Sequence, residues 1–200
     1  MTAAAGAVAL IGLTTVVASL GWLHLEPTGL SPLRNAVSQY GITPFRAGYR
    51  VATLAFALAG VALALALHRA LGDQHGVSDI VVALAVFAFA RAVISWFPMD
   101  APGAPRSSTG QTHGLLAIVT FAAATYAAFK LGTVLSRATR WHSLAGVSTA
   151  LGWAMLVCLL AMMLARSVPA VRARFGAVER CFYLAAIAWF AVFATASLAL

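Results

Sequence analysis

From Val51 to Leu67 the chain reads VATLAFALAGVALALAL, a run without a charged side chain. This run lies within an apolar segment that extends over about residues 45–71. A helix needs roughly 20 mostly apolar residues to cross the hydrocarbon of a bilayer. We therefore predict a transmembrane helix over this segment.

The composition extends this conclusion to the whole chain. Of its 200 residues, 62% are apolar and only 9% are charged, whereas a soluble domain carries about 25% charge. A soluble domain, a disordered chain and a disulfide scaffold are therefore excluded. The net charge of +8 predicts contact with anionic lipid and not with nucleic acid. Abundant alanine and a strong preference for arginine over lysine favour a bacterial origin with a GC-rich genome.

Similar apolar segments recur, and we predict an all-α polytopic membrane protein, a six-transmembrane-helix bundle that forms one domain over residues 1–200. The spans are expected at about 3–23, 45–71, 78–97, 111–132, 142–166 and 177–200. No basic residue precedes the first span, so we interpret it as a true span and not as a signal peptide. Small residues recur in every span, and they allow close packing of membrane helices. The expected location is the inner (plasma) membrane.

The loops of this arrangement are unequal. Loops one, three and five, at about 24–44, 98–110 and 167–176, lie on one side of the membrane. The short loops, at about 72–77 and 133–141, lie on the other side with both termini. All seven prolines fall in the long loops, where they restrict the backbone. Any functional site is therefore expected on the long-loop face.

Local signals predict structure within these loops. Ser31-Pro32 resembles a helix N-cap followed by a proline at the first helical position. We expect a short amphipathic helix from there to Tyr40, lying in the membrane interface, with Gly41 as its C-terminal cap. In loop three, Ser108 and Gln111 have the spacing of a capping box, which would begin the fourth span.

Several polar side chains lie in or beside the predicted spans, where burial in the membrane costs free energy. Arg91 falls within a span, where a charge costs roughly 3 kcal/mol or more. It either extends toward the interface or forms an ion pair or an anion contact on the long-loop face, with Asp100 or Glu179 as possible partners. Asp100 and His113 flank loop three and together suit a metal site or acid–base chemistry, and the alternative for His113 is a hydrogen bond that holds the loop.

The candidate binding residues are polar groups expected at or near the long-loop face. They are Arg34, Asn35, Ser38, Arg91, Asp100, His113, Glu179 and Arg180. The potential metal ligands on this face share no helical spacing, so we predict no resident metal and no cofactor.

Three short motifs resemble those of the Domain of Unknown Function 998 family. They are HLEPTGLSPLRNAVSQYG from His24 to Gly41, WFPMD from Trp96 to Asp100 with GQTH from Gly110 to His113, and Val178-Glu179-Arg180. The resemblance implies six spans and no assigned activity. It also implies a set of shared residues, namely Pro32, Arg34, Asn35, Ser38, Gly41, Pro98, Asp100, His113 and Arg180. Gln39 departs from the acidic residue common at its position.

The orientation has two opposing indications. Eight arginines lie on the long-loop side and its flanks, against four basic residues on the other side, which places the long loops in the cytoplasm. The family is similar in layout to the DRAM-like membrane proteins, and this resemblance implies that the long loops lie outside the cytoplasm.

Two hypotheses for the function follow. The first is a non-enzymatic membrane protein whose rim, formed by loops one, three and five, binds an anionic group such as a lipid headgroup, or a partner protein. The second is a membrane enzyme that acts on a lipid-linked substrate through Asp100 and His113. The expected partners are membrane lipids, with a membrane-protein partner or a homo-oligomer as further alternatives.

Overall fold

The computed structural model describes residues 1–72 and 74–200, and it confirms the all-α class. Its elements are α1 (Thr2–Leu25), η1 (Val37–Ile42), α2 (Arg46–Leu71), α3 (Val77–Val93), η2 (Ile94–Trp96), α4 (Ser108–Leu135), η3 (His142–Leu144), α5 (Ala145–Leu164), α6 (Pro169–Arg172) and α7 (Phe175–Leu198). Among the described residues, six helices are long and apolar enough to cross a membrane. These residues contain no strand.

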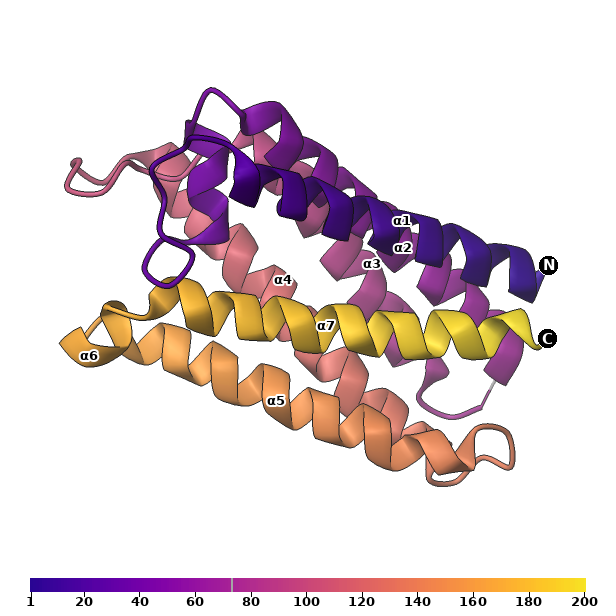
Figure 1. Cartoon of the computed structure of the whole chain (residues 1–200). Helices are drawn as coiled ribbons and strands as arrows, with labels where there is room; N and C mark the ends of the chain where they lie inside the picture. Colours follow the sequence, from indigo (N-terminus) through magenta and orange to yellow (C-terminus); the bar gives the residue numbers. More distant parts are fainter. Residues whose placement is uncertain (73) are drawn as a thin grey trace.

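The long helices close into a ring. Each of α1 to α4 packs on the next, α5 packs on α7, and α7 returns to pack on α1. Figure 1 shows both termini at one end of the bundle, and loops one, three and five at the other. The predicted division into a long-loop face and a short-loop face is therefore correct.

Small residues and aromatic side chains pack in different parts of the helix bundle. A Cβ on Gly12 would lie 2.8 Å from the carbonyl oxygen of Ala55, so glycine allows α1 and α2 to approach closely. Near the middle of the bundle, the rings of Phe56, Phe87 and Phe190 pack with centroids 5.0–5.2 Å apart. Edge-to-face and tilted contacts of this kind add to the stabilisation that burial provides.

A serine joins three helices in the buried interior. The Ser148 hydroxyl on α5 donates to the carbonyl oxygen of Ala128 on α4 at 2.7 Å. It accepts a hydrogen bond from the indole Nε1 of Trp189 on α7 at 2.8 Å. Both Ser148 and Trp189 are fully buried. The indole N–H is therefore satisfied inside the bundle, where water is not available to replace its partner.

The predicted helix in loop one is wrong. The backbone N–H groups of Arg34 and Asn35 both donate to the carbonyl oxygen of Ser31, which forms a single turn. The Asn35 side chain accepts from the N–H of Ser31 at 2.7 Å, and such local bonds compete with helix formation. Ala36 is extended, and the 3₁₀ helix η1 follows.

Two predicted caps are also wrong. Gly41 lies inside η1, and a Cβ there would lie 2.9 Å from the Tyr49 ring, so close packing explains this glycine. The N-cap of α4 is Ser107, whose hydroxyl accepts from the N–H of Gly110 at 3.0 Å. The capping box predicted from Ser108 and Gln111 therefore places the N-cap one residue too late.

The Ser148 contacts give a prediction for stability. We expect Ser148→Ala to lower the free energy of unfolding by about 1 kcal/mol, in the range measured for hydrogen bonds between membrane helices. The physical reason is the unpaired indole N–H of Trp189. Ser148→Thr, which keeps a hydroxyl, is the matched variant. Denaturant unfolding in detergent, followed by tryptophan fluorescence, measures both, and equal stability of wild type and Ser148→Ala would contradict the prediction.

Candidate functional site

A cavity of about 540 Å³ lies between α4, α5 and α7 at the long-loop end of the bundle. Figure 1 shows α4 and α5 meeting at the end with the termini and diverging toward the long loops. They meet closely because Gly132 of α4 faces the backbone of α5, where a Cβ would lie 3.2 Å from the carbonyl oxygen of Ala145. The cavity occupies the space that this divergence opens.

All three long loops contribute to the cavity wall. The lining residues from these loops are Ala36 and Ser38 in loop one, Met99 and Arg106 in loop three, and Ala165, Arg166 and Arg172 in loop five, which in the structure begins after Leu164. The Ser38 hydroxyl donates to the Met99 sulfur at 3.2 Å, which links loop one to loop three.

The deeper part of the cavity is apolar and reaches the surface that faces lipid. Phe121 on α4 and Met162 on α5 line its inner wall. Ile118 and Met163 also line it and are 38% and 53% exposed on membrane-spanning helices. Phe121 lies thirteen residues after Ser108, which is about 20 Å along the helix axis at 1.5 Å per residue. The cavity thus extends from the loops well into the depth of the bundle.

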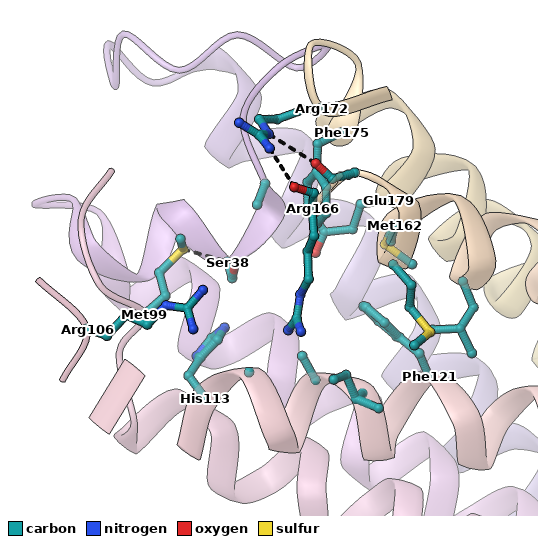
Figure 2. A pocket seen from close by; sticks show the side chains of 17 residues that line it. Ser38, Met99, Arg106, His113, Phe121, Met162, Arg166, Arg172, Phe175 and Glu179 are labelled. Atoms are coloured by element: carbon teal, nitrogen blue, oxygen red, sulfur yellow. Dashed lines mark hydrogen bonds between the residues drawn. The ribbon is translucent and has the colours of Figure 1, made fainter. Parts of the chain in front are cut away.

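Two arginines bring positive charge to the mouth of the cavity. Figure 2 shows the side chains of Arg106 and Arg166 pointing into it, toward the part of α4 that carries His113. Both side chains are exposed, and within residues 1–72 and 74–200 neither guanidinium forms a hydrogen bond, although the charge of Arg106 acts on the Asp100 carboxylate. Arg172 donates to the carbonyl oxygens of Ala165 and Arg166 at 3.0 and 2.6 Å, so it fixes the backbone that presents Arg166.

His113 and Glu179 line the same cavity from opposite helices, and both are buried. His113 Nδ1 lies 2.7 Å from the carbonyl oxygen of Phe97, so it donates its hydrogen there and holds loop three. The Glu179 Oε2 accepts from the backbone N–H of Val37 at 2.6 Å, which ties loop one to α7. Each side chain keeps a second polar atom that is not used in these bonds.

Arg180 acts as an anchor for loop one. Its Nη1 donates to the carbonyl oxygens of Pro32 and Asn35 at 2.8 and 2.9 Å. Its Nε donates to the His24 Nε2 at 2.9 Å. A Cβ on Gly176 would lie 2.6 Å from the same Pro32 oxygen, so glycine is needed for loop one to approach α7. Arg180 does not line the cavity.

The structure contradicts two of the arrangements expected for Arg91, the extension toward the interface and the ion pair with Asp100 or Glu179. The side chain is only 2% exposed, so it does not extend toward the interface. Its guanidinium donates to the Tyr183 hydroxyl and lies over the rings of Tyr183 and Phe56, 5.0 and 5.7 Å from their centroids. The only ion pair within the described residues joins Lys130 to Asp79 at 2.6 Å. Cation–π contacts and the tyrosine hydroxyl therefore take the place of the expected carboxylate partner.

Asp100 and His113 do not form the expected pair, since no hydrogen bond joins them in the described part of the chain. Asp100 accepts from the hydroxyl and the backbone N–H of Ser107 at 2.5 and 3.1 Å. These hydrogen bonds lower the pKa of Asp100 below its ordinary value. The carboxylate also lies directly against Gly110, where no Cβ would fit. Asp100 therefore organises the start of α4.

The predicted site residues thus separate into groups. Ser38, His113 and Glu179 line the cavity, whereas Arg91, Asp100, Asn35 and Arg180 hold the structure around it. Arg34 is exposed and does not line the cavity. Arg106 and Arg166 were absent from the predicted site, although their positions beside prolines and span ends are visible in the sequence.

Among the residues that the structure describes, no group of three His, Cys, Asp or Glu side chains could hold a metal ion. The hydrogen-bond donors at the cavity are mainly guanidinium groups, which bind anions and not cations. The chemistry that these residues can perform is recognition of an anionic group beside an apolar wall.

Six membrane-spanning helices and a cavity at one end define the class, a multi-pass membrane protein. The chain belongs to the protein of unknown function family DUF998, whose sequence model matches residues 5–196. The comparisons with curated proteins and with solved structures gave no match. The expected family and six-span description are confirmed.

The Arg180 contacts give a second prediction. We expect Arg180→Ala to destabilise the fold by about 2 kcal/mol, as for other hydrogen bonds that involve a charged group. The amide of Val37 should then exchange faster with solvent, because loop one is no longer held against α7. Hydrogen exchange read by mass spectrometry, with thermal unfolding, measures both effects. Arg174→Ala removes the same charge from the exposed end of loop five, and equal exchange in the two variants would contradict the prediction.

Proposed function

We propose that this protein is a non-enzymatic lipid-binding protein of the bacterial plasma membrane, and that its cavity binds the phosphate-bearing headgroup of a membrane lipid. One observation carries the proposal. Two exposed arginines, Arg106 and Arg166, whose guanidinium groups form no hydrogen bond within the described residues, lie at the mouth of an apolar cavity that reaches the lipid-facing surface.

The chemistry of the two arginines suits a phosphate. A guanidinium presents several N–H donors in a planar fork that matches phosphate oxygens, often with two parallel hydrogen bonds. Arg106 and Arg166 come from different loops, so together they approach one anion from two directions. Arg34 lies on the same face and is exposed, and we propose for it only a general attraction of anionic lipid to this surface.

The apolar wall favours a lipid over a free anion. A cavity of about 540 Å³ is in the range of small-molecule sites, and it has room for a headgroup and the start of the acyl chains. Ile118 and Met163 lie on its wall and on the exposed surface of the spans. A lipid can therefore keep its chains in the membrane while its phosphate lies between the arginines.

Lipid retention tests this function. We expect the double variant Arg106→Ala/Arg166→Ala to lose about tenfold or more of the phospholipid that copurifies with wild type, because each charged hydrogen bond contributes about 1.5–3 kcal/mol. Native mass spectrometry of protein released from nanodiscs measures the retained lipid. Arg174→Ala is the matched control, and it should retain lipid as wild type does.

Two outcomes would contradict the proposal. The first is equal retention in the double variant and in wild type. The second is displacement of the bound lipid by millimolar inorganic phosphate in the nanodisc, which would show that the cavity recognises a free anion and gains nothing from the apolar wall.

A further inference from the structure

We propose that the cavity selects among phospholipids for a headgroup that carries its own hydrogen-bond donors, a hydroxyl or an ammonium N–H, beyond the phosphate. This inference rests on the proposed function and adds a specificity to it. It comes from the second polar atoms of Glu179 and His113, two side chains that line the cavity together with the two arginines and whose second atoms have no partner within the described residues.

Glu179 presents an acceptor without a protein donor. It lies in the first turns of α7 and is only 5% exposed. Its Oε2 accepts from the Val37 N–H at 2.6 Å, and within the described residues no donor pairs with its Oε1. The neighbouring Arg180 does not supply one, because its Nε donates to His24 and its Nη1 to loop one, while its Nη2 is buried and forms no hydrogen bond within the described residues. The Oε1 is not among the fully buried polar atoms that lack a partner, so it is accessible from the cavity that Glu179 lines, and a ligand that brings a donor there pairs with it.

His113 presents a second acceptor. Because the carbonyl oxygen of Phe97 only accepts, the bond to Nδ1 places the hydrogen of the neutral ring on that nitrogen. The Nε2 of the neutral imidazole is then a lone-pair acceptor.

The cavity therefore offers donors to one part of a ligand and acceptors to another. Arg106 and Arg166 suit the phosphate oxygens, and Glu179 with His113 suit hydroxyl or N–H groups. A phosphodiester to ethanolamine or to glycerol has both features. A phosphodiester to choline has the phosphate and a cation but no N–H, and phosphatidic acid has no headgroup alcohol. A site with unpaired acceptors discriminates strongly against a ligand that lacks the matching donor.

A methylation series of one lipid tests the inference on the wild-type protein. Nanodiscs contain equal amounts of phosphatidylethanolamine, its monomethyl and dimethyl forms, and phosphatidylcholine, all with identical acyl chains. We expect native mass spectrometry to show at least about fivefold enrichment of phosphatidylethanolamine over phosphatidylcholine, equal to one lost hydrogen bond. A parallel disc with phosphatidylglycerol and phosphatidic acid tests whether a hydroxyl serves as well as an ammonium group.

Glu179→Gln identifies the acceptor responsible. The amide oxygen still accepts from the Val37 N–H, while the amide NH₂ turns a donor toward the cavity. We expect the fivefold preference of phosphatidylethanolamine over phosphatidylcholine to disappear while the thermal midpoint stays near that of wild type. His113→Gln, which keeps a donor for the Phe97 oxygen, should reduce the preference in the same direction.

The inference and the proposed function fail in different measurements. The inference is overturned if wild type retains phosphatidylethanolamine and phosphatidylcholine equally and, in the parallel disc, does not enrich phosphatidylglycerol over phosphatidic acid. An unchanged preference in Glu179→Gln also overturns it. The proposed function is judged separately, by the total phospholipid that the Arg106→Ala/Arg166→Ala variant retains.

Discussion

The requirement that backbone polar groups near a membrane have partners shapes the long-loop end of this protein. Loop one leaves α1 and crosses the end of the bundle without regular helix until η1, so its carbonyl and N–H groups need donors and acceptors from elsewhere. The first turns of α7 supply both kinds. Arg180 donates to the carbonyl oxygens of Pro32 and Asn35, and Glu179 accepts from the N–H of Val37. Loop one is thereby fixed over the cavity.

Close packing of α4 and α5 at the end of the bundle with the termini creates space between them at the long-loop end. Gly132 brings α4 against α5 near the termini, and Ser148 joins both helices to Trp189. Helices that meet closely at one end and cross at an angle must separate at the other. The long loops and apolar side chains such as Phe121 line this separation without filling it. A cavity that reaches the lipid is a consequence of the bundle geometry and of loop lengths.

Much of the fold could be predicted because the signals for spans are local. Hydropathy over about 20 residues is enough to place a transmembrane helix, and the six predicted spans agree with the structure within a few residues. The helix expected after Ser31 failed because long-range bonds from Arg180 and a local bond from Asn35 determine that backbone. The roles of Asp100 and Arg166 depend on contacts between segments, so neither composition nor spacing indicates them.

Arginines that line a cavity or hold a loop also enter the count of basic residues from which the membrane orientation is predicted. Eight arginines on the long-loop side against four basic residues on the other favour a cytoplasmic location for the long loops. Five of the eight have contacts that explain their position. Arg172 and Arg180 satisfy backbone carbonyls, Arg106 and Arg166 line the cavity, and Arg50 lies over the Trp96 ring at 5.1 Å. On the opposite face, Arg69 donates to the carbonyl oxygen of Met1 and Lys130 pairs with Asp79. Setting aside the residues with such contacts leaves three arginines on the long-loop side and two basic residues on the other, so most of the excess positive charge on the long-loop face belongs to the cavity and to the loops that close it.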